Sequence, residues 1–310
     1  MNGFLSIGEC MVEMAPAEGG QFRMGYAGDT FNTAWYAARM LPDDWRVGYA
    51  SAVGDDAVSG AMCDFIAAQG VDTAHIRRLN GKTVGLYMIQ LQNGERSFSY
   101  WRGQSAARHL ADDAPWLDAA FQGQKMLFFS GITLAILPPA ARDTLCAALA
   151  RARANGAHVA FDTNLRPRLW DSADAMRHGL MQGAAVADTI LPSFDEEQLA
   201  FGDSDPAQTM NRYRAAGATT IALKNGDASC HIWSKSEGEL RYDPPPVAQV
   251  VDSTAAGDSF GAGFLATRAT GGGIGLAVDR AARLAGAVIQ RRGALAPDIF
   301  DDPTFLGGMT

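Results

Sequence analysis

The chain has little of several features that mark large classes of proteins. Its 310 residues contain only 4 cysteines, scattered along the chain, so neither a disulfide framework nor a Cys-x-x-Cys metal site is expected. There is no run of about 18 apolar residues that would cross a bilayer, and the amino terminus lacks the pattern of a signal peptide. The net charge of −8 argues against a nucleic-acid partner. We therefore expect a cytoplasmic protein with reduced thiols, no membrane segment and no nucleic-acid partner.

Two common nucleotide-binding motifs are also missing. The sequence has no Gly-x-x-x-x-Gly-Lys-Ser/Thr loop, and no Gly-x-Gly-x-x-Gly follows its first apolar run. The 5 histidines show no metal-ligand spacing. These absences disfavour a Walker-type nucleotide site, a Rossmann dehydrogenase and a zinc site.

Short apolar runs that predict strands alternate with stretches that predict helices. The helices have typical start and stop signals, such as the proline at the start of Pro138–Asn155 and the glycine just after it. Two further helices are expected over Thr30–Met40, with Asp29 as N-cap, and over Ala57–Gln69. The predicted strands are Phe4–Ile7, Val47–Ala52, Met126–Ser130, Val159–Asp162, Thr189–Leu191 and Thr220–Lys224. This alternation indicates an α/β fold with a mostly parallel sheet covered on both faces.

One segment departs from this alternation. Residues Lys82–Arg102 contain two strand-like runs around Asn93-Gly94, a dipeptide typical of a tight hairpin turn. Together with Glu9–Tyr26, this hairpin is expected to form a small antiparallel flap. A second hairpin is expected at Ser229–Tyr242, with its turn near Ser236–Gly238. We see no linker between these parts, so a single domain over residues 1–310 is expected.

The segment Val250–Phe264 is the most informative stretch of the chain. A strand-like run ends at Asp252, small residues follow, and Asp258 opens a helix rich in glycine and alanine. The unpaired amides at such a helix start attract an anion, and small side chains let a ligand approach them. A carboxylate in this place makes sense if Asp258 takes a proton from an attacking hydroxyl while the amides hold a phosphoryl group. The alternative is that Asp258 only caps the helix.

Polar groups that suit a small ligand occur in two further places. Asn32 lies in the first helical turn after Gly28, where short polar groups either bind sugar hydroxyls or cap a helix. On the predicted hairpin, Tyr100 and Arg102 share a face and Tyr87 stands on the opposing strand. An aromatic face with one arginine suits a polar anion, although plain hairpin packing with a solvated arginine is the alternative.

The loop after Val159–Asp162 carries Asn164, Arg166 and Arg168. It follows a strand, so it lies at the carboxyl edge of the sheet, where α/β proteins bind ligands. Arg166 is suited to bind a carboxylate or a phosphate through two parallel hydrogen bonds, whereas a surface ion pair is expected for Arg168.

Taken together, these segments resemble the ribokinase-like (PfkB) family of sugar kinases over nearly the whole chain. The late motif of that family, Asp-Thr-x-Gly-Ala-Gly-Asp, is matched by Asp252–Asp258, and an early glycine and asparagine motif by Gly28–Asn32. One branch, the 2-keto-3-deoxygluconate kinases, is similar in three stretches: Tyr100-Trp101-Arg102 before Ser105-Ala106-Ala107, Ser130–Leu137 and Asn164–Trp170.

The resemblance implies a three-layer α/β/α ribokinase-like core with a mostly parallel sheet and a small β lid formed by about residues 9–26 and 82–103. It implies that ATP, with Mg²⁺, phosphorylates the terminal hydroxyl of 2-keto-3-deoxygluconate, which gives 2-keto-3-deoxy-6-phosphogluconate and ADP. The alternatives are a related kinase, such as a fructokinase or a 5-dehydro-2-deoxygluconate kinase, and a catalytically idle sugar-binding protein. Two arginines near the site favour a sugar acid over a neutral sugar, and Asp258 argues against an idle protein. A homo-oligomer is also expected.

The resemblance assigns roles to the positions that match the family's motifs. It implies that Asp258 is the catalytic base and that Ala255, Ala256 and Gly257 form the anion hole. The implied substrate contacts are Gly28, Asn32, Tyr87, Tyr100, Arg102 and Arg166. The implied nucleotide contacts are Asn164, Lys224, Asn225, Gly226, Asp227 and Ala228.

Two positions depart from the family pattern. Ala255 replaces a glycine, which restricts the backbone of the anion hole. Ser193 replaces the asparagine of the family's metal-linked Asn-x-x-Glu motif. Glu196, the glutamate of that motif, is therefore expected to hold Mg²⁺ through water rather than directly.

Overall fold

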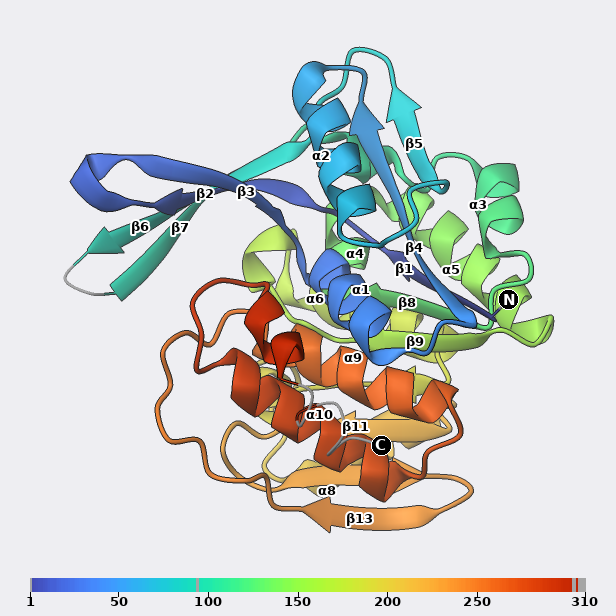
Figure 1. Ribbon diagram of the computed structural model, residues 1–310. Helices are drawn as coiled ribbons and strands as arrows, with labels where there is room; N and C mark the ends of the chain where they lie inside the picture. The colour runs from blue at the N-terminus through green and yellow to red at the C-terminus, as the bar shows by residue number, and fades with distance from the viewer. Residues whose placement is uncertain (1, 93–94, 303–304, 306–310) are drawn as a thin grey trace.

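The computed structural model describes residues 2–92, 95–302 and 305, and a central sheet runs through its middle (Figure 1). Among the described residues this sheet has 9 strands. In spatial order they are β13 (Gly238–Tyr242), β12 (Cys230–Ser234), β11 (Thr220–Leu223), β10 (Thr189–Ile190), β9 (His158–Asp162), β8 (Met126–Ser130), β1 (Asn2–Ile7), β4 (Trp45–Gly54) and β5 (Ile76–Leu79). The strands from β5 to β11 are parallel, and β12 and β13 continue the sheet in antiparallel pairs. The mostly parallel sheet and the second hairpin predicted from the sequence are thereby confirmed.

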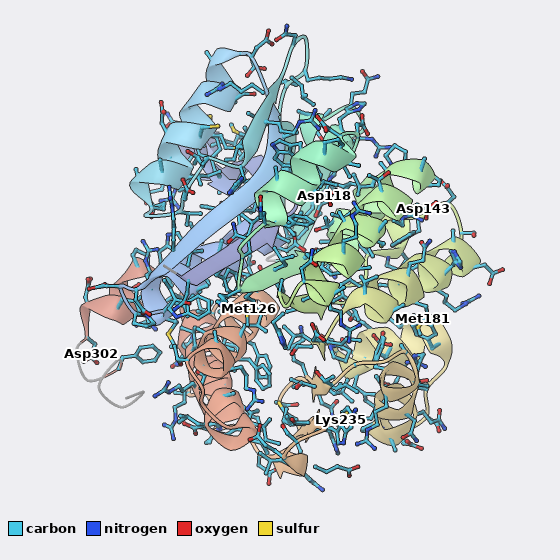
Figure 2. All side chains as sticks on the ribbon, turned by 90° about the vertical axis from the view of Figure 1, so that its right-hand side faces the viewer. Asp118, Met126, Asp143, Met181, Lys235 and Asp302 are labelled. Carbon is cyan, nitrogen blue, oxygen red and sulfur yellow. The ribbon has the colours of Figure 1, made fainter. Side chains whose placement is uncertain are left out.

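Helices cover both faces of this sheet. One layer contains α1 (Asp29–Met40), α2 (Ala57–Ala68), α9 (Ala256–Ala269) and α10 (Ile274–Val288). The other layer contains α3 (Ala114–Phe121), α4 (Gly131–Ile136), α5 (Pro139–Ala154), α6 (Ala173–Val186), α7 (Phe194–Phe201) and α8 (Pro206–Ala215). In Figure 2, Asp118, Asp143 and Met181 mark α3, α5 and α6 of this second layer along one side of the molecule. Short 3₁₀ turns lie at η1 (Glu18–Gly20), η2 (Ala106–His109), η3 (Pro167–Leu169) and η4 (Pro297–Asp301).

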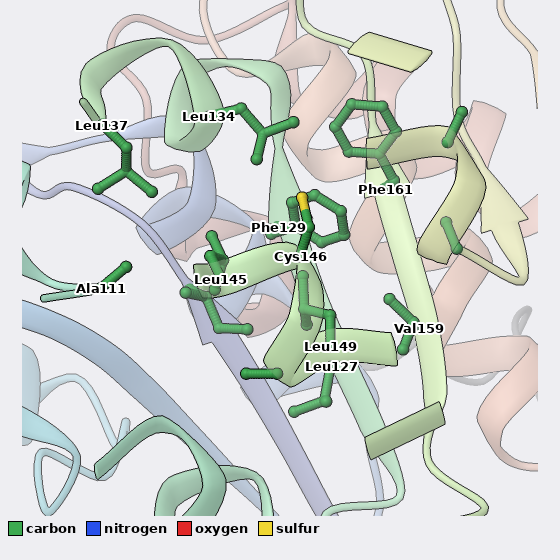
Figure 3. Close-up of a cluster of buried hydrophobic side chains, with 14 of the residues drawn as sticks. Ala111, Leu127, Phe129, Leu134, Leu137, Leu145, Cys146, Leu149, Val159 and Phe161 are labelled. Carbon is green, nitrogen blue, oxygen red and sulfur yellow. The ribbon is translucent and has the colours of Figure 1, made fainter. Parts of the chain in front are cut away.

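The two faces of the sheet bury separate apolar cores. On β8, Leu127 belongs to the core beneath α5, whereas the next residue, Phe128, belongs to the core on the α9 side, because successive side chains of a strand point to opposite faces. Figure 3 shows Leu145 and Leu149 of α5 in one cluster with Leu127 of β8 and Val159 of β9. There the rings of Phe129 and Phe161 stack with centroids 4.7 Å apart. These cores fix the strand ends that carry the polar groups described below.

A second sheet projects from the body of the molecule (Figure 1). We call it the flap sheet; its strands, in order, are β3 (Phe22–Ala27), β2 (Met11–Pro16), β6 (Gly85–Gln92) and β7 (Glu95–Trp101). The expectation of a wholly antiparallel flap is wrong, since β2 and β6 pair in parallel. The reason is that both strands leave the same edge of the central sheet, β2 after β1 and β6 after β5, and so run outward together. The predicted turn at Asn93-Gly94 lies outside the described residues.

Two local expectations are also wrong. Asp29 is not the N-cap of α1, because Gly28 holds that position and Asp29 is the first helical residue. The strand expected to end at Asp252 does not form over the described residues 247–252. Three prolines precede this stretch, and Val250 and Val251 are exposed, to 61% and 42%, so no neighbouring strand covers them.

Candidate active site

The start of α9 is open at the carboxyl edge of the central sheet. Ala255, the residue before this helix, has a left-handed backbone with a φ of 60°. The first turn carries only the small residues Ala256 and Gly257 before Asp258, and no side chain among the described residues caps it. The Ala256 N–H donates to the Ser253 carbonyl oxygen over 3.2 Å, so the amides that follow it, from Gly257 on, are the ones available to an anion. This geometry suits the anion hole that the sequence predicts.

Asp258 is held within this turn by the first turn of α1. Asn32 Nδ2 donates a hydrogen bond of 2.8 Å to Asp258 Oδ2, and Thr33 Oγ1 donates one of 3.3 Å to the Asp258 carbonyl oxygen. Burial, followed by the nearby Asp29 carboxylate, raises the pKa of Asp258 to about 7. A carboxylate with a pKa near neutrality is well matched to accept a proton. Asn32, predicted to contact the substrate, is itself buried and bound to Asp258.

The loop after β9 connects several of the predicted residues. Asp162 is 3% exposed, and its Oδ2 accepts a hydrogen bond of 2.8 Å from Lys224 Nζ. Its Oδ1 accepts a bond of 3.1 Å from the backbone N–H of Asn164. Asn164 has a φ of 30°, and its Nδ2 donates to Asp29 Oδ2 over 2.9 Å. The loop therefore contacts the predicted nucleotide lysine on one side and α1 on the other.

Arg166 lies farther along this loop and is paired with Glu196. Its guanidinium lies 2.9 Å from Glu196 Oε1, and Glu196 Oε2 accepts a bond of 3.0 Å from the Leu165 N–H. Burial raises the pKa of Glu196, against the attraction of Arg166. Within the described residues, no group of three or more His, Cys, Asp or Glu side chains could hold a metal ion. The water-mediated contact between Glu196 and Mg²⁺ stays a prediction.

Two predicted tyrosines lie opposite each other on the flap sheet. Tyr87 and Tyr100 are register partners, and their ring centroids are 5.9 Å apart. Tyr87 is 8% exposed and its hydroxyl donates to the carboxylate of Glu13, whereas Tyr100 is 53% exposed. Of the two, Tyr100 therefore offers the more accessible ring to a ligand.

Arg102 follows β7 at the point where the flap sheet joins the body. Its guanidinium pairs with the Glu9 carboxylate, and the two side chains are only 10% and 1% exposed. Glu9 follows β1, so this buried ion pair ties the flap sheet to the central sheet. Beside it, a Cβ on Gly28 would lie 2.2 Å from the Glu9 carbonyl oxygen, so only glycine fits there. Arg102 is thus a paired cation, not the free one that the sequence suggests.

The predicted nucleotide loop joins β11 to β12. Gly226 has a φ of 59° at the turn, and Ala228 N–H donates to the Asn225 carbonyl oxygen over 2.9 Å. Gly226, Asp227 and Ala228 are exposed, whereas the side chain of Lys224 reaches back to Asp162.

From the sequence, no role in the site is predicted for four carboxylates that hold the predicted residues in place; Asp29 is expected only to cap a helix. Glu9, Glu13, Asp29 and Asp162 are the partners of Arg102, Tyr87, Asn164 and Lys224, respectively. The one local signal is that a carboxylate stands within or directly after an apolar run, as Asp162 does after Val-Ala-Phe. A carboxylate in such a place must be paired when the run is buried.

Comparisons with known proteins point to one family. Residues 1–299 match the model of the pfkB family carbohydrate kinases. The chain is 38% identical to the 2-dehydro-3-deoxygluconokinase of Dickeya dadantii strain 3937, over 94% of this chain and 96% of that protein. It is 31% identical to a fructokinase of Klebsiella pneumoniae, over 96% and 94% of the two chains.

A solved structure extends the likeness to three dimensions. The aminoimidazole riboside kinase of Salmonella enterica, crystallised with aminoimidazole riboside and an ATP analogue, superposes with a TM-score of 0.81 at 25% identity, covering 98% of this chain and 100% of that one. Among the described helices, none is both long and apolar enough to span a bilayer. From the match over residues 1–299 and these relatives, the chain belongs to the pfkB family of carbohydrate kinases.

Proposed function

We propose that this kinase transfers the terminal phosphoryl group of ATP to the terminal hydroxyl of 2-dehydro-3-deoxygluconate, the sugar acid also called 2-keto-3-deoxygluconate. The observation that carries the chemistry is Asp258, a carboxylate with a pKa of about 7 at the uncapped start of α9. The substrate follows from the relatives of that name, which are 38% identical over nearly the whole chain.

Asp258 acts as the general base. It accepts the proton of the substrate hydroxyl as that oxygen attacks the phosphoryl group, and the Asn32 side chain keeps the carboxylate oriented. The first-turn amides of α9, that of Gly257 foremost, stabilise the negative charge of the phosphoryl oxygens during the transfer. The carboxylate and the amides thus serve different parts of one reaction.

The nucleotide is proposed to lie between Asn164 and the loop Lys224–Ala228. Both stand at the carboxyl edge of the sheet, and the exposed turn at Gly226 leaves room for a planar base or a ribose. The lysine places a positive charge beside the phosphates without a Walker loop.

Mg²⁺ is proposed to enter with the nucleotide. When bound, it neutralises phosphate charge. Both oxygens of Glu196 already accept a hydrogen bond, one from the Leu165 N–H and one from Arg166. Each oxygen keeps a second lone pair, so a contact through water fits.

The sugar acid is proposed to lie between the flap sheet and the β9 loop. Arg166 is the better candidate for its carboxylate, since the Arg166 side chain is 51% exposed and that of Arg102 only 10%. Tyr87 and Tyr100 line the flap side. In this role the flap sheet is a lid over residues of a single kinase domain, and its closure excludes water and limits wasteful hydrolysis of ATP.

A fructokinase is the second candidate, because a fructokinase is also a full-length relative, at 31% identity. The two differ in the charge of the substrate. A panel of sugars and sugar acids, assayed by ADP release from ATP, separates them. We expect 2-dehydro-3-deoxygluconate to be phosphorylated with a kcat/KM at least about tenfold above that of fructose. A preference for fructose would replace the proposal with the second candidate.

Two further expectations remain predictions. The homo-oligomer is testable by light scattering of the purified protein. The cytoplasmic location is in keeping with the four cysteines, all of which are free thiols.

A further inference from the structure

Asp162 is a buried carboxylate that the reaction proposed above does not use. It ends β9, a strand in the middle of the central sheet, and is 3% exposed. Removing a carboxylate from water is costly unless charged and hydrogen-bonding partners replace the water. Asp162 has two such partners, one for each oxygen, and they lead to opposite sides of the candidate site.

The first partner is Lys224. Its side chain is 13% exposed, and Nζ lies 2.8 Å from Asp162 Oδ2. A Cβ built on Gly257 would lie 3.4 Å from this Nζ, so the ammonium group stands directly beside the first turn of α9. A lysine side chain is flexible and loses conformational entropy when it is fixed. The Asp162 carboxylate fixes it beside the open amides, where an anion would sit.

The second partner is the backbone of Asn164. Asp162 Oδ1 accepts the Asn164 N–H over 3.1 Å, which closes a turn two residues long. Within this turn Asn164 has a φ of 30°, a strained conformation for a residue other than glycine. The turn aims Asn164 Nδ2 at Asp29 on α1, 2.9 Å away.

From these contacts we infer that Asp162 is a positioning residue for phosphoryl transfer: its carboxylate holds the Lys224 ammonium beside the anion site at the start of α9 and sets the Asn164 turn against α1. The inference rests on the proposed kinase function. Asp162 itself touches no reacting atom, and it acts by fixing a cation that binds the phosphates.

Asp162→Asn tests this assignment because it removes the charge and keeps the shape. The amide oxygen can still accept the Asn164 N–H, so only the Lys224 contact is weakened. We expect a folded protein in which the Kd of a nonhydrolysable ATP analogue rises, and kcat/KM falls, by about tenfold or more. The KM for the sugar acid should stay within about threefold of the wild-type value, because the Asn164 turn persists.

The double variant Asp162→Asn/Lys224→Met gives a readout that a merely structural role would not. If Lys224 acts only when Asp162 holds it, its removal from the Asp162→Asn protein should cost at most about threefold in kcat/KM. A larger further loss would show that Lys224 is in place without Asp162 and would overturn the inference. So would an Asp162→Asn protein within about threefold of wild type in both kcat/KM and analogue binding.

Asp188→Asn is the matched control. Asp188 likewise accepts bonds from a cation, Arg153 Nε at 2.7 Å, and from a backbone amide, Val159 N at 2.9 Å, but at the amino end of the strands. The Asp188→Asn variant should keep a kcat/KM within about twofold of the wild-type value. It therefore measures separately what the loss of a partly buried charge costs in activity.

Should Asp162→Asn not fold, Lys224→Gln carries the test, since a glutamine amide still donates to Asp162 but brings no charge to the anion site. It should weaken binding of the ATP analogue by about tenfold, and unchanged binding would overturn the inference. If the wild-type enzyme does not phosphorylate the sugar acid, the proposed substrate fails. The analogue-binding arm still tests Asp162.

Discussion

The two ends of the central sheet use the same kinds of residue in different ways. At the amino end, Asp188 binds Arg153 and a backbone amide. At the carboxyl end, Asp162 binds Lys224 and a backbone amide in the same manner. The difference is in what surrounds these pairs. Beside its ion pair, the carboxyl end has strained backbone and two further carboxylates, Asp29 and Asp258, that accept hydrogen bonds from asparagine side chains.

Strain is confined to the carboxyl end. Asn164 and Ala255 are the non-glycine residues with positive φ in the part of the chain that the structure describes, and both lie there. The amino end has instead a surface hollow of about 710 Å³, lined by residues such as Trp45 and His158. None of the predicted site residues lines that hollow. In this molecule, strain and clustered carboxylates coincide with the proposed site, whereas the hollow does not.

The largest effect that this contrast predicts is that of Asp258→Asn. The variant should fold and bind the ATP analogue, because an amide keeps the shape of the carboxylate. It should lose about 10²–10⁴ in kcat, since it cannot accept a proton. Steady-state kinetics of the folded variant is the measurement, with Asp188→Asn as control. A kcat within about threefold of wild type would leave Asp258 as a helix-capping residue only.

Arg166→Ala should have the next largest effect. Loss of a charge-assisted bond to the substrate carboxylate should raise the KM for the sugar acid about tenfold or more and change the KM for ATP far less. Arg168→Ala, an exposed neighbour on the same loop, is the matched control and should leave both constants near wild type.

An analogue whose carboxylate is reduced to an alcohol completes this test. It should bind the wild-type enzyme weakly and lose little more in the Arg166→Ala variant, because the two changes remove the same contact. Equal discrimination between acid and alcohol by wild type and variant would place the substrate carboxylate elsewhere.

Much of the fold could be predicted because its signals are local. The bounds of β8 match the predicted Met126–Ser130, since an apolar run between turn residues is enough to define a buried strand. The position of the loop with Asn164 and Arg166 at the sheet edge could be predicted for the same reason, since the loop directly follows a predicted strand.

The pairings at the site could not be predicted, because they join distant parts of the chain. Arg102 and Glu9 are 93 positions apart, and Lys224 and Asp162 are 62 apart. In the sequence, each of these charged side chains could equally be exposed to solvent or bind the substrate. Only the fold shows that each already contacts a side chain of opposite charge. The parallel pairing of β2 with β6 depends in the same way on where both strands leave the central sheet.

The pH dependence of kcat/KM should show the raised pKa of Asp258. Below its pKa of about 7 the carboxyl group of the free enzyme is protonated and cannot act as a base, so kcat/KM should fall about tenfold for each pH unit. Above that value the rate should reach a plateau. A rate that stays constant well into the acid range would contradict the assignment of Asp258 as the base.

Ala255→Gly should have the smallest effect. Glycine adopts a φ of 60° without the strain that alanine carries there, and this relief should raise the free energy of unfolding by about 0.5–1 kcal/mol. The greater conformational entropy of glycine in the unfolded chain offsets part of that gain. Thermal unfolding measures this change. A lower melting temperature would show that the strain relieved at this position is smaller than the entropy cost of glycine and would contradict the prediction.

The most direct test of the contrast between the two ends is a crystal structure with a nonhydrolysable ATP analogue. The terminal phosphate should lie within hydrogen-bonding distance of the Gly257 amide and of Lys224 Nζ, with the nucleoside over the loop Lys224–Ala228. Density for the nucleotide in the hollow at the amino end, or against the flap sheet, would contradict the assignment of the carboxyl edge as the site of phosphoryl transfer.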